Sequence, residues 1–576
     1  MRAGHRRAAP LAALAALMLA GCTPALPESV VPGTEIMVGW NGELTSTNAA
    51  AAPTPGNVDV AEAIRGDFGD VIEGEFVPDE GFGTVTIVSD DPFTVRYDLA
   101  EPVWSDGIPL DAADLLLGWA DTVGLLPAEA GEDGAADDAA DDAGPEDAAD
   151  PPAPPKIDEF ARTIDATWPT PRMDWQTAVK ASVPAHVVGA RAFGIDDAME
   201  AKQAVIDAIQ DEDAAALAEI AEVWNAGFEL EDGAQAPAEL LLSSGPFQID
   251  DITTDEDGQG VTLVPNTSYR GLVTAKVARI DLVPGGDDPL ADIGDRLDVV
   301  QLRPTAANRE PVRELERVDF TVNTSHDGTV WSVQLNPAGV FGGAPARAAF
   351  LRALPASALV ERGGGEWASA YTASTSMVSA PGSRAYDIVA EDSGFTAALG
   401  TPADDAAVDR ESAGVAAGSR VCVLYDRSSE FAVGAFAALR DAAAEAGWGV
   451  TDCGSDDYQA ALEQRSWNAV IARVPIPQSA AQIADQWGTE GTASLTRNAD
   501  ADRDALIAQL SQTTDVYEAR EVRAQIEATI VRAAVALPIA ANPQLTVIDR
   551  GVTGVSTRNG ADASLTSGMT QWEVVP

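Results

Sequence analysis

Side chains suited to nucleophilic, acid–base or metal chemistry are sparse in this chain of 576 residues. Beyond the N-terminal region only His186 and His326 offer an imidazole, and neither lies in a His-Glu-x-x-His zinc motif. The sequence has no Gly-x-Ser-x-Gly elbow, no Cys-x-x-Cys pair and no Gly-Lys phosphate loop. Carboxylate pairs carry no information about glycoside hydrolysis, because 91 acidic residues make chance pairs unavoidable. The sequence therefore predicts no enzyme, no catalytic residue, no metal site and no cofactor.

Cys422 and Cys453 are the two cysteines in the body of the chain, and an oxidising compartment would permit them to pair. Residues 421–425 and 448–453 are predicted as consecutive parallel strands around a helix at 431–446. One cysteine then lies near a strand start and the other at a strand end, too far apart for a bridge unless the strands are offset in register. We expect two buried free thiols at least as readily as a disulfide.

The N-terminal region has the pattern of an export signal. Three arginines precede an apolar run at residues 8–20, which is too short to span a bilayer as a permanent helix. The run ends in Leu-Ala-Gly-Cys22, which resembles the lipobox at which bacterial lipoproteins are cleaved and acylated. We predict a lipoprotein signal peptide at 1–21, lipid on Cys22 and a tether at 22–34. The rest of the chain would then be extracytoplasmic, held at the outer face of the cytoplasmic membrane by lipid alone.

The formal net charge of −55 disfavours binding to nucleic acid or to anionic lipid headgroups. The clearest break in composition is residues 127–155, where alanine, aspartate, glutamate, glycine and proline alternate. Such a stretch cannot bury enough apolar surface to fold, so we predict a disordered acidic insertion. It contains no regular calcium-binding loop.

Strand and helix patterns are mixed throughout, which indicates an α/β fold. Residues 84–89 and 93–99 alternate polar with apolar side chains and predict a β-hairpin, and a helix capped by Asp111 follows. Residues 248–252 and 261–265 predict a second hairpin around turn residues.

The order of these motifs resembles family five of the extracytoplasmic solute-binding proteins, which serve peptide and nickel ABC importers. The family's strand ending in Tyr-x-Leu, its Ser-Asp-Gly-x-Pro turn and its Ala-x-Asp helix are matched by Tyr97-Asp98-Leu99, Ser105-Asp106-Gly107-Ile108-Pro109 and Ala112-Ala113-Asp114. Later blocks follow in the family's order: Ser244-Gly245-Pro246-Phe247, Asn266-Thr267-Ser268-Tyr269, Arg347-Ala348-Ala349-Phe350, helices at 502–512 and 515–534, and Ala536-Leu537-Pro538-Ile539. The abundance of alanine, aspartate and glycine, with few lysines, is typical of proteins from high-GC actinobacterial genomes, which together with the lipobox suggests an actinobacterial lipoprotein.

The resemblance implies two α/β lobes of the periplasmic-binding-protein type, joined by hinge strands, with a small domain inserted early and ligand held between the lobes. We expect lobe I from residues 35–45, 160–275 and 500–576, the inserted domain from 46–126, and lobe II from 276–499. The resemblance also implies a monomeric binding component that captures peptides or similar small solutes and delivers them to ABC permease subunits. An exported enzyme, or a lipoprotein that presents ligand to a sensor, remains as an alternative.

Candidate ligand contacts follow from where the strands should end. The first strand, predicted at 35–38, should end at the cleft, which makes Trp40, Asn41 and Glu43 candidates. In lobe II the strand at 468–472 should deliver Arg473, with Trp487 nearby. The alternatives are a core position for each tryptophan and a surface position for Arg473.

One departure from the family bears on the ligand. Many peptide-binding members follow the lobe II strand with a Trp and then an Asp that pairs with the peptide's amino terminus, whereas residues 473–479 hold no acid here. A peptide anchored in another way, a sugar or a metal chelate therefore all remain possible ligands. At the cleft, Arg473 would favour a carboxylate or another anionic group.

Overall fold

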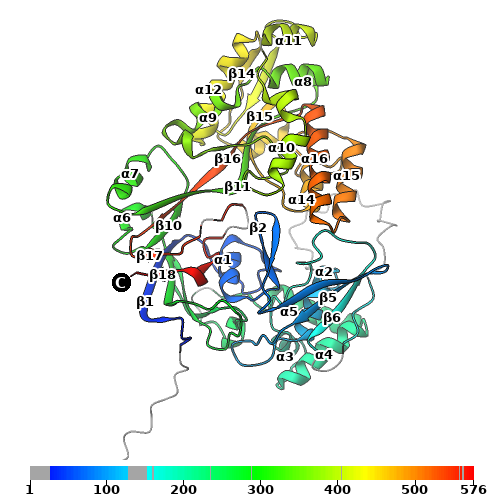
Figure 1. Cartoon of the computed structure of the whole chain (residues 1–576), viewed down its shortest axis with the longest axis vertical. Coiled ribbons are helices and arrows are strands. Elements are labelled where there is room, and N and C mark those ends of the chain that lie inside the picture. The colour runs from blue at the N-terminus through cyan, green and yellow to red at the C-terminus, as the bar shows by residue number, and fades with distance from the viewer. Residues whose placement is uncertain are drawn as a thin grey trace, which may run out of the picture.

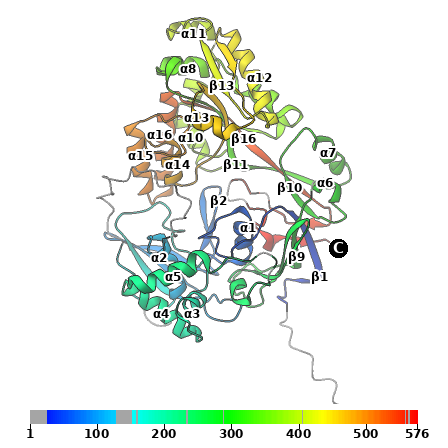
Figure 2. The same cartoon turned by 180° about the vertical axis from the view of Figure 1, so that it is seen from behind.

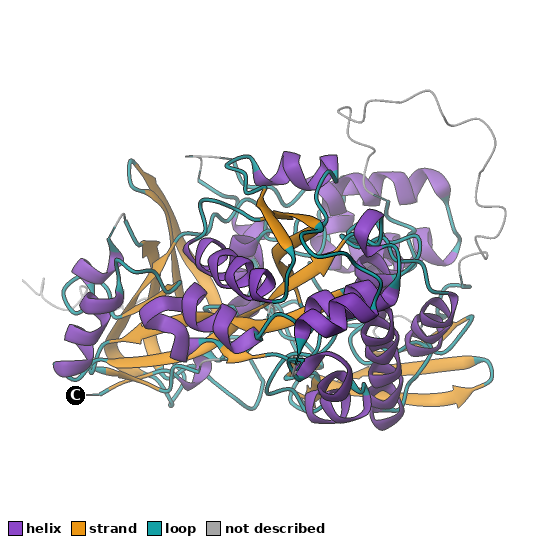
Figure 3. Ribbon diagram, turned by 90° about the horizontal axis from the view of Figure 1, so that it is seen from above, coloured by secondary structure: helices purple, strands orange, loops and turns teal. Residues whose placement is uncertain are grey.

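The computed structural model describes residues 26–127, 152–157, 161–231, 233, 235–286, 288–403, 405–556, 558–560 and 564–575. Cys22, the predicted signal peptide and most of the predicted acidic insertion lie outside these ranges. Within them, no helix combines the length and the apolar character needed to cross a bilayer. Helices and strands are mixed through the whole molecule, so the α/β class is confirmed (Figures 1 and 3).

One mixed sheet of eleven strands runs through the molecule in the order β14-β13-β15-β11-β16-β10-β1-β9-β8-β7, with β12 beside β16. Its strands are β1 (Val31–Trp40), β7 (Phe247–Asp255), β8 (Gly258–Pro265), β9 (Val277–Pro284), β10 (Val299–Leu302), β11 (Thr321–Leu335), β12 (Thr372–Ala373), β13 (Arg420–Leu424), β14 (Gly449–Asp452), β15 (Ala469–Pro475) and β16 (Ala536–Ile548). The predicted second hairpin is β7 and β8. The first strand begins earlier than predicted, because Val31 already pairs with Val277 of β9.

Strands β11 and β16 pass from one lobe to the other (Figures 1 and 2). Residues 321–326 of β11 pair with 543–548 of β16 beside β10, and residues 330–334 pair with 536–541 beside β15. The register shifts between His326 and Val330, so the ladder is interrupted midway. The two-lobed arrangement implied by the sequence is therefore present, and β11 and β16 are its hinge strands.

The lower lobe of Figure 1 holds β1 to β10 and α1 to α6. Outside the main sheet its elements are α1 (Pro55–Ile64), β2 (Gly69–Ile72), β3 (Glu75–Pro78), β4 (Gly83–Asp90), β5 (Phe93–Leu99), α2 (Ala112–Thr122), β6 (Thr163–Trp168), α3 (Ala185–Phe193), α4 (Ala198–Gln210), α5 (Ala214–Ala226) and α6 (Pro289–Asp292). The predicted first hairpin is β4 and β5, and β6 adds a third strand to it. Short strands β17 (Val552–Thr553) and β18 (Glu573–Val574) complete this lobe.

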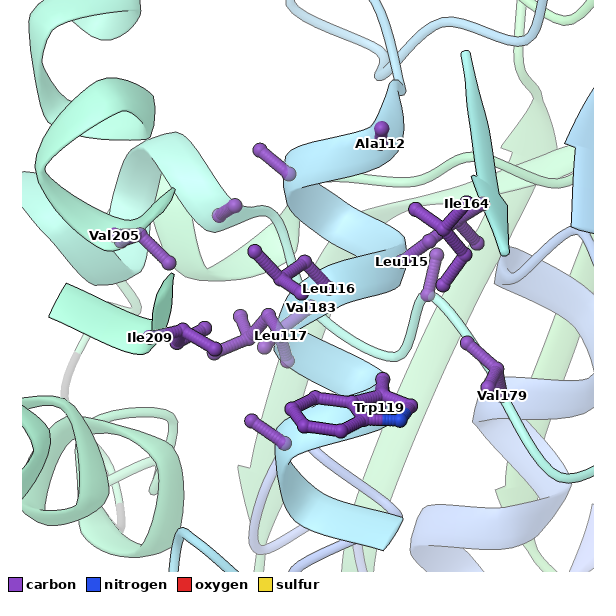
Figure 4. Close-up of a cluster of buried hydrophobic side chains, with 14 of the residues drawn as sticks. Ala112, Leu115, Leu116, Leu117, Trp119, Ile164, Val179, Val183, Val205 and Ile209 are labelled. Atoms are coloured by element: carbon purple, nitrogen blue, oxygen red, sulfur yellow. The ribbon is translucent and has the colours of Figure 1, made fainter. Parts of the chain in front are cut away.

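Helix α2 is the centre of the core beside this three-stranded sheet (Figure 4). Asp111 caps it as predicted, in a capping box with Asp114. Leu115 points toward Ile164 of β6, whereas Leu117 points toward Ile209 of α4 (Figure 4). The helix is therefore buried on opposite sides, against the sheet and against the helices.

The Ala-x-Asp block of the family resemblance has a structural role here. Asp114 is 1% exposed, and its Oδ1 accepts hydrogen bonds from the Ala185 amide at 2.8 Å and Trp104 Nε1 at 3.1 Å. Its Oδ2 lies 2.8 Å from Nζ of the buried Lys202, which also lies 3.0 Å from Asp111 Oδ2. The block thus ties α2 to α3 and α4.

Helix α7 (Arg309–Arg317) lies between the lobes (Figure 1). The upper lobe holds β12 to β15 and the helices α8 (Ala344–Leu351), α9 (Ala356–Gly364), α10 (Tyr386–Asp392), α11 (Ala406–Ser412), α12 (Glu430–Glu445), α13 (Tyr458–Gln464), α14 (Ala480–Trp487), α15 (Ala501–Ser511) and α16 (Val516–Ala533). The two predicted late helices are α15 and α16. They pack against α14 and α10, so the predicted assignment of this segment to lobe I is corrected to the upper lobe. Conversely, β9 and β10 were predicted in lobe II but lie beside β1 in the lower lobe.

Cys422 and Cys453 form a disulfide with a Cα–Cα distance of 5.6 Å, which decides between the two alternatives that the sequence left open. In the parallel pair β13–β14, Cys422 lies opposite Thr451. Cys453 comes two residues later, and a two-residue offset keeps both side chains on the same face of the sheet. The offset between the two strands therefore brings Cys422 close to Cys453, which the predicted strand bounds had placed too far apart for a bridge.

The described ends of the predicted acidic insertion pack on the lower lobe. Pro154 and Pro155 are buried, and the Pro155 carbonyl accepts a hydrogen bond from Gln210 at 3.0 Å. The Pro127 carbonyl accepts one from Asn225 at 3.1 Å. The predicted boundaries of 127 and 155 are therefore too wide, because prolines at both ends are held by α4 and α5.

Candidate ligand-binding cavity

A cavity of about 1630 Å³ lies in the lower lobe and reaches the hinge strands. Its sheet side is formed at the carboxyl ends of the parallel strands β1 and β10, where Asn41 and Arg303 follow the last strand residues. The carboxyl edge of parallel strands is the usual ligand site in open α/β sheets. Gln301, Gln544 and Asp327 extend this side along β10, β16 and β11. The walls come from α1, the β2–β3 hairpin and residues 564–571.

Trp40 and Asn41 line the cavity, and their contact with a ligand stays a prediction. The Trp40 side chain is 3% exposed, and its Nε1 donates a hydrogen bond to Asp59 Oδ2 at 2.8 Å. Asn41 is exposed, and its Oδ1 accepts a hydrogen bond from the Gly285 amide at 3.3 Å. Glu43 is exposed but lies outside the cavity lining. The structure thus brings two of the three predicted β1 residues to one wall.

The two predicted residues of the upper lobe do not line the cavity. Arg473 lies on β15 opposite Trp331, and its Nη1 is 3.8 Å from Oδ2 of Asp327, which does line the cavity. Trp487 is 2% exposed and packs in a core cluster with Ile483 and Leu510. It is the last residue of α14 and faces α15, so its place is the core position named as its alternative.

Two acidic residues of α1 line the cavity and were not predicted. Asp59 and Glu62 are three residues apart, which places them on one side of the helix. Burial raises the pKa of Asp59, and the hydrogen bonds from the Trp40 indole and the Leu565 amide oppose that rise. Burial also raises the pKa of Glu62, and the charge of Asp70 adds to it, while Arg558 opposes it. The sequence signal that could have indicated this wall was the spacing of two acidic residues, three apart, on one short helix.

Most basic groups of the cavity already have partners. Lys180 Nζ lies 3.1 Å from Asp67 Oδ2, and Arg558 is paired with Asp70 and lies 3.7 Å from Glu62 Oε1. Arg65 donates its hydrogen bonds to backbone carbonyls, including those of Ser182 and Thr47. Burial lowers the pKa of Arg65 to about 10.

The hinge carries a hydrogen-bonded group of polar side chains. Asn542 of β16 donates to Asp327 Oδ2 at 2.7 Å and accepts from Trp331 Nε1 at 2.8 Å. His326 is buried, with its Nε2 3.3 Å from the Pro381 carbonyl and its Nδ1 accepting from the Gly328 amide at 3.3 Å. Burial lowers the pKa of His326. The neutral ring with its proton on Nε2 satisfies both contacts.

Within the part of the chain that the structure describes, no three histidine, cysteine, aspartate or glutamate side chains gather as metal ligands. The cavity lining offers amides, carboxylates and an indole, which suit reversible binding of a polar ligand.

No protein-family model matches the sequence. An uncharacterized lipoprotein of Mycobacterium tuberculosis (strain ATCC 25618 / H37Rv) is 27% identical over 234 residues, which cover 39% of this chain and 37% of the relative. One of Mycobacterium leprae (strain TN) is 27% identical over 288 residues, or 50% of this chain and 46% of the relative. The chain therefore spans less than half the length of the curated relatives that it matches.

Solved structures match over nearly the whole chain. The periplasmic EDTA-binding protein EppA has a TM-score of 0.71 at 16% identity, covering 95% of this chain and 98% of that one. The ABC transporter substrate-binding protein CtaP of Listeria monocytogenes has a TM-score of 0.69 at 15% identity, covering 94% and 100%. The oligopeptide-binding protein AppA of Bacillus subtilis, in complex with a nonapeptide, has a TM-score of 0.57 at 11% identity, covering 94% and 99%.

Proposed function

We propose, from the fold that this chain shares with the substrate-binding proteins of peptide and nickel ABC importers, that it captures a short peptide and delivers it to permease subunits. The ligand would bind in the cavity of the lower lobe and be covered when the upper lobe closes over it. The protein would act as a monomer and return its ligand chemically unchanged. Nucleic acid is not a partner in this proposal, because the net charge of −55 opposes it.

The size of the cavity is the observation that carries the proposal. Its volume of about 1630 Å³ exceeds the roughly 300–1,000 Å³ of pockets for single drug-sized molecules. The amides of Asn41, Gln301 and Gln544 line it and can each donate and accept hydrogen bonds with a peptide backbone. A monosaccharide or a small metal chelate would leave much of this space to water. An oligopeptide fits the volume and the polarity better.

We propose further that lipid on Cys22 holds the protein at the outer face of the cytoplasmic membrane. The lipobox in the sequence and the lipoprotein names of the mycobacterial relatives support this anchor. Cys22→Ser should move the protein from the membrane fraction to the soluble extracytoplasmic fraction while its melting temperature stays the same. Retention of the variant in membranes would contradict the anchor.

A library of peptides of two to ten residues, screened by thermal shift, tests the ligand class. A binding peptide should come off the protein intact in mass spectrometry. With that peptide, Gln544→Ala should weaken binding roughly five- to tenfold, because a hydrogen bond contributes about 1 kcal/mol. The matched control is Gln203→Ala, since Gln203 is also half-buried but lies on α4 outside the cavity lining.

Two outcomes would replace this proposal. If every peptide fails while a recovered sugar or chelate stabilises the protein, the ligand class is wrong and solute binding remains. If a bound compound is converted into a product, the protein is an exported enzyme. The sensor alternative predicts that the loaded protein does not bind permease subunits in membrane vesicles.

A further inference from the structure

The cavity holds more acid than base. Among the described residues that line it, seven are aspartate or glutamate and four are arginine or lysine. Lys180 is engaged by Asp67, and Arg558 by Asp70 and Glu62. Arg65 is half-buried, and its guanidinium donates hydrogen bonds to the backbone carbonyls of Ser182, Leu242 and Thr47. Three of the four cationic side chains are therefore engaged by acids or by backbone carbonyls, whereas Arg303, just after β10, forms no ion pair with the described residues. The seven acids still outnumber the four cations.

Asp59 is the clearest of these acids. Its carboxylate accepts hydrogen bonds from the Trp40 indole at 2.8 Å and from the Leu565 amide, both of which are neutral donors. No arginine or lysine of the described chain forms an ion pair with it within 4.0 Å. A half-buried carboxylate without a counter-ion is partly desolvated at a cost, and a bound cation would offset that cost.

Glu62 lies one turn further along α1 and lines the same wall. Its nearest cation is Arg558 at 3.7 Å, but Arg558 is more closely paired with Asp70. The Ser567 hydroxyl contacts Glu62 Oε1 at 3.2 Å. Both carboxylates thus line the cavity from α1, and among the described residues Arg558 is the one cation within 4.0 Å of either.

We propose that Asp59, with Glu62 beside it, makes the cavity selective for ligands that carry a positively charged group, such as peptides with a lysine or arginine side chain. The inference rests on the proposed function, because it takes the cavity to be the ligand site. It differs from the expectation that Arg473 attracts an anionic group, since Arg473 itself is not part of the lining and lies 3.8 Å from Asp327, which is.

The ionisation of the two acids supports the same conclusion. Burial raises the pKa of Asp59 and of Glu62, so each acid holds its proton to a higher pH than an exposed one does. A cation bound beside them favours the charged form and lowers both pKa values. Binding of a cationic ligand near pH 5 should therefore release protons, which calorimetry in buffers of different ionisation enthalpy detects.

The test uses three pentapeptides that differ only in the central side chain: Ala-Ala-Lys-Ala-Ala, Ala-Ala-Gln-Ala-Ala and Ala-Ala-Glu-Ala-Ala. Their affinities are measured by titration calorimetry on the full mature protein in 0.15 M salt, where weak surface attraction is screened. The lysine peptide should bind at least about tenfold more tightly than the glutamine peptide, and the glutamate peptide should bind most weakly.

The preference should depend on α1. Asp59→Asn keeps an oxygen acceptor for the Trp40 indole and should reduce the lysine-to-glutamine ratio to about threefold or less. Glu62→Gln is the second variant and should reduce the ratio in the same direction if Asp59→Asn unfolds. The matched control is Glu222→Gln, because Glu222 is an exposed acid of α5 outside the lining, and the ratio should not change.

The outcomes separate this inference from the proposed function. Equal binding of the lysine and glutamine peptides, or a preference that survives both α1 variants, would overturn the charge selectivity and leave peptide binding intact. If no peptide binds but spermidine does, and Asp59→Asn removes that binding, the peptide class fails and the selectivity holds. If neither peptides nor spermidine bind, both proposals are wrong.

Discussion

At the scale of single residues, the positions that identify the family resemblance are those that hold the fold together. Asp114 receives hydrogen bonds from two backbone amides, an indole and an ammonium group, and it does not line the cavity. Asp106 of the Ser-Asp-Gly turn contacts His186 at 3.0 Å. Motif matching could therefore predict the fold from such residues, but it could not point to the ligand.

Removing the Asp114 carboxylate should be strongly destabilising. Asp114→Ala leaves Lys202 buried with one fewer counter-ion and leaves amide groups unpaired, which should cost about 3–5 kcal/mol in the free energy of unfolding. Urea denaturation measures this loss. Asp106→Ala is the comparison and should cost about 1 kcal/mol or less, because the Asp106 side chain is 33% exposed. Equal losses for the two variants would contradict this account.

His326 should make stability depend on pH. Burial lowers its pKa in the folded protein below the ordinary value of 6.5, although Asp327 and Glu73 oppose that shift. As pH falls below about 6.5, the unfolded chain takes up the proton before the folded one, so folding stability decreases. Its contribution is complete above that pH and is lost as pH falls through the folded pKa. His326→Gln should flatten the curve of unfolding free energy between pH 7.5 and 5.5, and an unchanged curve would refute this role.

At the scale of elements, strongly patterned segments were predictable and their partners were not. The hairpins β4–β5 and β7–β8 follow from alternating side chains and turn residues, and α15 and α16 follow from the family resemblance. Asp59 and Glu62 were missed because residues 46–126 read as a separate domain, whereas α1 packs beside the carboxyl end of β1. That contact depends on tertiary packing, which local sequence patterns do not contain.

The disulfide between β13 and the end of β14 should stabilise the upper lobe. It links residues 31 positions apart. Closing a loop of that length lowers the conformational entropy of the unfolded chain, which in the chain-entropy account raises the free energy of unfolding by about 3–4 kcal/mol. Cys422→Ser with Cys453→Ser should lower the unfolding free energy by that amount. Thermal denaturation with and without reductant measures it, and the double variant should no longer respond to reductant. If reductant does not lower the stability of the unmodified protein, the bond does not form.

At the scale of the whole molecule, the two lobes are joined by the hinge strands and also touch directly. Glu75, in the β2–β3 hairpin that walls the cavity, pairs with Arg384 at 2.9 Å and with Arg520, both of the upper lobe. The cavity lining is nevertheless almost entirely from the lower lobe, with hinge residues at its edge. A ligand seated there would gain upper-lobe contacts only by further closure.

Ligand binding should therefore compact and stabilise the protein. A peptide at about a hundred times its dissociation constant should add about 2.7 kcal/mol to the unfolding free energy. The radius of gyration in X-ray scattering should fall on saturation, because the closed form is favoured by contacts on both sides. Stabilisation without any change in radius would show that the lower lobe binds ligand alone and that closure is not coupled to binding.

The position of β16 has a consequence for how the chain assembles. It is among the last strands in chain order, yet it lies between β11 and β10, in the middle of the sheet. A chain emerging from its N-terminus would have to keep the facing edges of β10 and β11 unpaired until residues 536–548 arrive. Shortening the chain just before Ala536 should leave each lobe with an open strand edge, so such fragments should aggregate instead of behaving as smaller binding proteins. The sheet can therefore be completed only after the whole of β16 has been synthesised.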